Sequence, residues 1–195
     1  QKRSTFKNKI HYKVYAGILE QMYSGIGGEI LYQPYKKRWA IGGSVNYVQK
    51  RDFSRNFDLL DYRTSTAFLS LFYASPFYNY DFSLHIGRYL AKDKGITIDV
   101  RRSFDNGVSI GAFATFTNVS SREYGEGSFD KGLFIKIPFD LFVKSNTRQS
   151  FGTIVRSIQR DGGQMLEGFD GTIWHNLRSV RFDNLYNNKD RMIPL

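Results

Sequence analysis

The sequence alternates with period two over most of its 195 residues, from Tyr12 to about Ile158. In residues 39–47, Trp39, Val45 and Tyr47 share one face, and Ser44 and Asn46 share the other. Each run is about ten residues long, which is nearly twice the usual soluble strand and enough to cross a bilayer at a tilt. This pattern predicts an all-β, antiparallel protein.

The alternating runs predict strands near residues 12–22, 25–34, 39–49, 61–74, 79–91, 95–104, 107–117, 131–138 and 150–158. Links at 35–38, 75–78 and 105–106 are short and fall at one end of the sheet; the last is an Asn-Gly hairpin signal. The opposite end has long polar links at 50–60 and 118–130 and a short one at 91–94. Short turns at one end and long loops at the other are typical of outer-membrane barrels.

Side chains near the strand ends favour the same architecture. Arg88 and Arg102 interrupt apolar faces only beside predicted connections, where an arginine costs little in a membrane. Aromatic residues also lie near predicted ends, as they do in interfacial girdles: Tyr12, Tyr32, Trp39, Tyr47, Tyr80, Tyr89 and Phe104. We therefore predict that residues 1–158 form an antiparallel transmembrane outer-membrane β-barrel, or part of one, of about nine strands. A soluble β-sandwich or barrel with core aromatics is the alternative.

Residues 159–195 depart from the alternation. Ile173, Leu177, Val180 and Leu185 approach helical spacing, which predicts a short helix at 172–186. We expect this C-terminal tail to lie outside the barrel pattern, on the periplasmic side.

Composition excludes several classes of function. Twenty-eight Lys and Arg residues against 18 Asp and Glu residues give a net charge of +10, which favours acidic polymers or anionic lipid headgroups as partners. No nucleic-acid-binding signature accompanies these charges. The chain has no cysteine, and its three histidines lack metal-ligand spacing. The acidic loop 122–130 lacks EF-hand spacing. We expect no metal, no cofactor and no catalytic residue.

Polar residues on the faces turned away from lipid would line a wet lumen. The candidates are Glu29, Asn46, His85, Asp99 and Arg101. Such a mixed lining suits contact with a hydrated sugar polymer, and it equally suits packing of the barrel interior.

Several strings in the sequence resemble the YjbH-like (GfcD-like) family of outer-membrane exopolysaccharide and capsule proteins. They are GEILYQP at 28–34, RWAIG at 38–42, NYV at 46–48, RDF at 51–53, GRYLA at 87–91, RSFDNGV at 102–108, GEGSFDKG at 125–132, IPFD at 137–140 and RDGGQ at 160–164. The resemblance covers roughly residues 25–166 and places this stretch in the C-terminal part of longer family members.

The resemblance implies a large outer-membrane β-barrel that assists secretion or assembly of an extracellular or capsular polysaccharide. The implied partners are that polysaccharide, outer-membrane lipid and lipopolysaccharide, and periplasmic proteins of the same system. An odd strand number would leave the barrel incomplete, so an N-terminal portion or a second chain is expected to complete it. Two alternatives are a soluble domain that binds or cleaves polysaccharide and a general porin-like or structural barrel.

Overall fold

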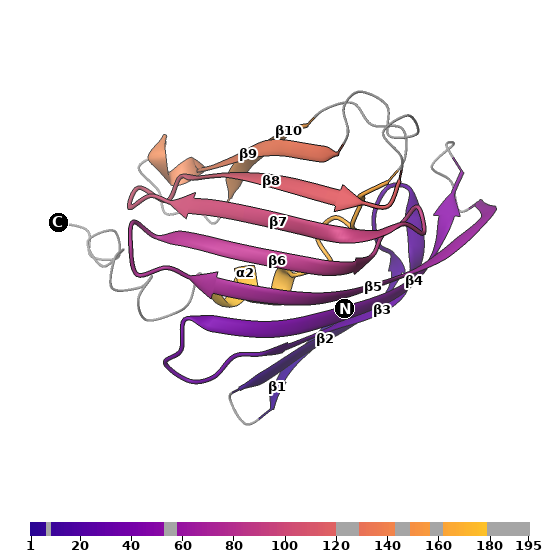
Figure 1. Cartoon of the computed structure of the whole chain (residues 1–195), viewed down its shortest axis with the longest axis horizontal. Coiled ribbons are helices and arrows are strands. Elements are labelled where there is room, and N and C mark those ends of the chain that lie inside the picture. Colours follow the sequence, from indigo (N-terminus) through magenta and orange to yellow (C-terminus); the bar gives the residue numbers. More distant parts are fainter. Residues whose placement is uncertain (7–8, 53–57, 120–128, 143–148, 157–161, 179–195) are drawn as a thin grey trace.

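A computed structural model describes residues 1–6, 9–52, 58–119, 129–142, 149–156 and 162–178. These residues form one antiparallel sheet of ten strands in which spatial order follows sequence order (Figure 1). The strands are β1 (Lys2–Phe6), β2 (Ile10–Ile18), β3 (Tyr23–Tyr32), β4 (Trp39–Arg51), β5 (Leu59–Ala74), β6 (Tyr80–Arg88), β7 (Lys94–Ser103), β8 (Ser109–Thr117), β9 (Asp130–Pro138) and β10 (Ser150–Arg156). A 3-10 turn, η1 (Phe139–Leu141), follows β9, and a helix, α2 (Thr172–Arg178), ends the described chain.

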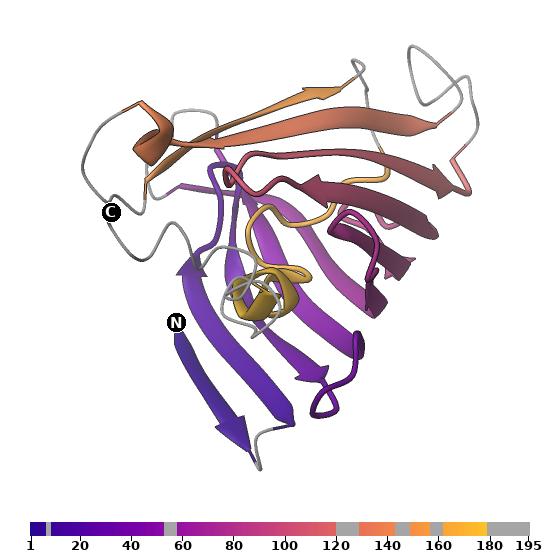
Figure 2. The same cartoon turned by 90° about the vertical axis from the view of Figure 1, so that its left-hand side faces the viewer.

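The sheet curves into a trough, and the segment that carries α2 lies on its concave side (Figure 2). In the described part of the chain, strands pair only with their sequence neighbours, so β1 and β10 remain as two edges. The predicted all-β antiparallel class is confirmed. A closed barrel is not formed by the described residues.

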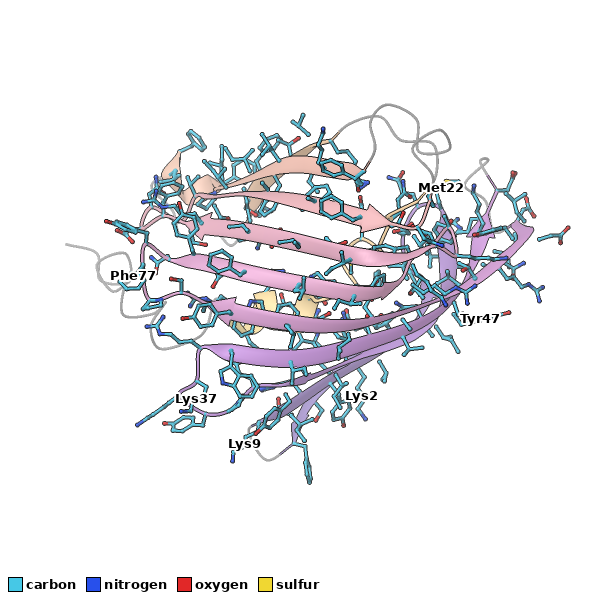
Figure 3. The ribbon with its side chains drawn as sticks, in the orientation of Figure 1. Lys2, Lys9, Met22, Lys37, Tyr47 and Phe77 are labelled. Atoms are coloured by element: carbon cyan, nitrogen blue, oxygen red, sulfur yellow. The ribbon has the colours of Figure 1, made fainter. Side chains whose placement is uncertain are left out.

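The two faces of the sheet have the reverse of the usual soluble distribution. Along β4, the apolar Val45 and Tyr47 are 63% and 52% exposed on the convex face, whereas the polar Ser44 and Asn46 are buried on the concave face. The same holds in the neighbouring strands, where Ile30, Leu69, Phe82, Ile98 and Ile110 are exposed. Figure 3 shows side chains projecting from this outer surface, with Tyr47 and Phe77 at opposite ends of the sheet.

The strand predictions need two corrections. β1 was not predicted, because its sequence KRSTF has no apolar alternation and is exposed throughout; the count is therefore ten instead of nine. The link at 139–149 is long but lies at the end of the short turns, so the loop-length pattern breaks after β9. At this end β9 stops at Pro138, because proline has no backbone N–H group to continue the hydrogen bonds of the strand.

The helix begins at Thr172 as predicted and reaches Arg178; the rest of the predicted span, 179–186, lies outside the described residues. We expected the tail to lie apart from the sheet pattern, but α2 packs on the concave face against β2 and β3. The reason is burial of Ile173 and Trp174 in a cluster with Leu31 and Phe72. Within the described part of the chain, no helix has the length and apolar character needed to span a membrane.

Candidate functional site on the concave face

The segment 162–178, here called the tail segment, is fixed to the sheet by a buried ion pair. Lys13 Nζ on β2 lies 2.8 Å from Glu29 Oε2 on β3, and both side chains are almost completely buried. Lys13 also donates to the Phe169 carbonyl at 2.6 Å and to the Thr172 hydroxyl. Glu29 accepts from the Ile173 amide and the Thr172 hydroxyl, each at 3.0 Å, so the pair holds the first turn of α2.

A second attachment is made by Asp170, which accepts hydrogen bonds from β4. Its carboxylate receives the Ser44 hydroxyl at 2.6 Å, the Asn46 amide at 3.0 Å and the Leu166 backbone amide at 3.3 Å. Asn46 in turn accepts from the Tyr15 hydroxyl. Burial raises the pKa of Asp170 above its usual value, and the donors from Ser44 and Asn46 oppose that effect.

Aromatic rings make a third attachment near the middle of the sheet. Trp174 stacks on Phe72, with ring centroids 5.3 Å apart, and His85 meets Phe72 edge-on at 5.6 Å. His85 Nδ1 lies 2.7 Å from the Ser70 hydroxyl. Burial is the main reason that the pKa of His175, which also meets the Phe72 edge, is lowered to about 3.

Charged groups hold the two ends of the tail segment, one on β6 and one in the turn between β6 and β7. Arg178 Nε donates to Asp81 Oδ1 at 2.8 Å. At the other end, the Gly163 amide donates to Asp93 Oδ2 at 2.8 Å. The segment is thus attached along its whole described length.

Beside the tail segment, the concave face of β6–β10 is not filled. A cavity of about 570 Å³ lies there, lined among others by Asp99, Arg101, Phe113, Phe134, Lys136 and His175. Asp99 Oδ1 and Arg101 Nε are buried and have no hydrogen-bond partner among the described residues. Arg101 instead places its guanidinium 4.8 Å from the ring centre of Phe134.

All five lumen candidates lie on the concave face, but the structure divides them. Glu29 and Asn46 hold the tail segment, His85 lies beside it, and Asp99 and Arg101 line the cavity. Sequence reasoning did not single out Lys13, Asp170 or Lys136. The alternation could have identified Lys13, because it is two residues from Tyr15 on the same face of β2. It also lies opposite Glu29 in the strand register. Asp170 could not, since nothing in the sequence indicates that the tail returns to the sheet.

No cluster of three or more metal-ligating side chains is present among the described residues. Most of the acidic loop 122–130 lies outside them.

Comparison with known proteins defines the class of the chain. The family described as exopolysaccharide biosynthesis protein YbjH matches residues 1–172, and the chain belongs to this family. It is 41% identical over 164 residues to a protein named "Uncharacterized lipoprotein YjbH" from Escherichia coli (strain K12). This match covers 82% of the chain but only 23% of the relative, so the chain spans about a quarter of that protein's length. No solved structure gives a significant match.

Proposed function

We propose that this chain is part of the wall of an outer-membrane β-barrel that assists secretion or assembly of an extracellular or capsular polysaccharide, without catalysing a reaction. The observation that carries the proposal is the distribution of side chains, with apolar residues exposed on the convex face and polar residues buried on the concave face. A soluble sheet buries its apolar face, whereas a membrane barrel turns that face to lipid. Family membership connects this wall to exopolysaccharide.

The dimensions of the convex face fit a bilayer. Its apolar band runs along β4 from Trp39 to Tyr47 and along β5 from Tyr73 to Ser65, which are paired residues in the register. At about 3.4 Å per residue and a tilt of about 40°, this band is roughly 20 Å tall, close to the apolar belt of outer-membrane barrels. Beyond the band, β5 continues with outward Asp61 and Arg63, as a strand does once it leaves the membrane.

The open edges of the sheet define what else the barrel requires. Strand pairing at β1 and β10 must come from another part of the longer protein or from a second chain, because unpaired backbone groups are costly in lipid. Lipid and lipopolysaccharide would contact the convex face, and periplasmic proteins of the same system would contact the end with the short turns.

Arginine placed at two depths tests the membrane assignment in the full-length protein. Leu69 lies in the middle of the band, and Ser65 lies at its end on the same face of β5. Leu69→Arg is expected to cost about 2–4 kcal/mol and Ser65→Arg about 0–1 kcal/mol, because the penalty depends on depth in the bilayer. The measurements are the amount of protein in the outer-membrane fraction and its unfolding in lipid vesicles.

A soluble β-domain predicts a different result, since both positions are exposed and both arginines would be tolerated equally. Equal behaviour of the two variants, with the full-length protein in the soluble periplasmic fraction, would refute the membrane assignment. Deletion of the gene tests the role in secretion: surface polysaccharide should fall in amount or chain length. An unchanged polysaccharide with a membrane-embedded protein would favour the porin-like alternative.

A further inference from the structure

We propose that the cavity between the tail segment and strands β7–β9 binds an acidic sugar residue, with Arg101 and Lys136 receiving its carboxylate and Asp99 accepting its hydroxyls. The inference rests on the proposed function and names the class of sugar and the part of the concave face that contacts it.

The register brings the two cations together at one end of the cavity. Arg101 on β7 lies opposite Gly111 on β8, which lies opposite Phe134 on β9. Lys136 is two residues from Phe134 on the same concave side of β9. Both cations also act on His175 of α2, since each contributes to lowering its pKa after burial, which is the main cause. The positive charges therefore converge on the space between α2 and the sheet.

The carboxylates around the cavity balance only part of this charge. Asp130 is buried and also lines the cavity, but it lies six residues from Lys136 along β9, at the far end. Asp81, directly across from Arg101 on β6, is already paired with Arg178 at 2.8 Å. Asp170 accepts three hydrogen bonds from other groups. Glu167 is largely exposed, at the edge of the cavity. Asp99 remains next to the cations, and its partnerless oxygen is an acceptor for a sugar hydroxyl.

Two aromatic rings shape the floor of the cavity. A Cβ added to Gly111 would come within 2.1 Å of the Phe134 ring, and one added to Gly132 would come within 2.6 Å of the Phe113 ring. Each phenylalanine thus lies flat across a glycine of the neighbouring strand, which leaves volume above the sheet. The Phe134 ring also supports the guanidinium of Arg101, so this cation is held in position before any ligand arrives.

Two buried polar atoms in the cavity lack hydrogen-bond partners among the described residues, which independently supports a bound ligand. A buried donor without a partner is costly, and native proteins rarely leave one. Arg101 Nε is such a donor, and Asp99 Oδ1 is an acceptor two residues away on the same face. A sugar acid supplies both complements at once, a carboxylate for the guanidinium and hydroxyls for the aspartate.

The test measures binding of trigalacturonic acid and of its methyl ester, in which methyl groups cap the carboxylates and remove their charge, to the full-length protein in detergent by calorimetry. We expect the acid to bind and the ester to bind about tenfold more weakly or worse, because charge-assisted hydrogen bonds are lost. Arg101→Gln and Lys136→Gln should each weaken binding of the acid by about tenfold or more and reduce its dependence on salt. The matched controls are Arg102→Gln and Lys131→Gln, whose side chains lie on the opposite face of the same two strands and should leave binding unchanged.

Equal affinity for the acid and the ester, or equal effects of the concave and convex variants, would overturn the inference. So would absence of binding by a protein that is folded and inserted in the outer membrane. In all these cases the proposed function would stand if deletion of the gene still reduced surface polysaccharide, so failure of the two proposals is distinguishable.

Discussion

At the scale of single residues, His175 is a buried titratable group of the tail segment. It lies in α2 against the edge of Phe72, and its pKa of about 3 is far below the value of about 6.5 expected in an unfolded chain. The docked segment therefore binds fewer protons than the undocked one between these values. The contribution of His175 to docking is complete above pH 6.5 and is lost as the pH falls toward 3.

We predict that lowering the pH from 7 to 5 weakens docking of the tail segment by about 2 kcal/mol through His175, since one pKa unit corresponds to about 1.4 kcal/mol. The measurement is hydrogen exchange of α2 amides, corrected for the intrinsic pH dependence of exchange. Asp170, whose pKa is raised by burial, acts in the opposite sense because its protonation favours the docked state.

The variant His175→Gln isolates the histidine contribution. Docking in this variant should lose most of its weakening between pH 7 and pH 5. A pH profile identical to that of the unmodified protein would show that His175 does not control docking.

At the scale of elements, the tail segment depends on the sheet for its structure. α2 has seven residues, which is too short for a helix to be stable alone in water. Its order comes from Trp174 packed on Phe72 and from the Lys13–Glu29 pair at its first turn. A single substitution in the Lys13–Glu29 pair is therefore expected to detach α2 from the sheet.

We predict that Lys13→Met makes docking of the tail segment less favourable by about 3–5 kcal/mol. The reason is that removing one partner of a buried pair leaves the other charge uncompensated. The amide of Ile173, which donates to Glu29, should exchange much faster, while amides of β4 and β5 change little. The control is Lys94→Met, which removes an exposed lysine at the start of β7. Similar exchange at Ile173 in both variants would contradict the assigned role of Lys13.

The elements also show what sequence can and cannot predict here. Alternation predicted nine of the ten strands. It also predicted that all five lumen candidates lie on the face opposite the apolar one, because side chains on one face of a strand repeat every two residues. It could not predict β1, whose exposed residues carry no such pattern. Nor could it predict that Asp170 accepts a hydrogen bond from Asn46, because these residues are 124 positions apart in the sequence and meet through tertiary packing.

At the scale of the whole molecule, the sheet formed by the described residues ends in two edge strands, β1 and β10. β1 is short and fully exposed, and only β2 pairs with it among the described residues. An exposed sheet edge is a template for further pairing. A closed barrel in the longer protein would satisfy it.

We predict that β1 amides directed away from β2 exchange rapidly in the isolated 195-residue chain and slowly in the full-length protein. The reason is that a neighbouring strand in the full-length protein would accept their hydrogen bonds. Hydrogen exchange with peptide-level resolution over residues 1–6 measures this difference. Equally rapid exchange in both would mean that β1 is a true edge and that closure does not occur there.

The pairing of each strand with its sequence neighbours also has a consequence for biogenesis. Such a meander can assemble hairpin by hairpin, because each new strand finds its partner already beside it. The tail segment is different, since Thr172 and Ile173 reach back to Lys13 and Glu29 in the first hairpins. Its hydrogen bonds go to β2, β3, β4 and β6, so docking must follow assembly of these earlier strands. A chain stalled before that step would lack the contacts of Thr172 and Ile173 with the Lys13–Glu29 pair.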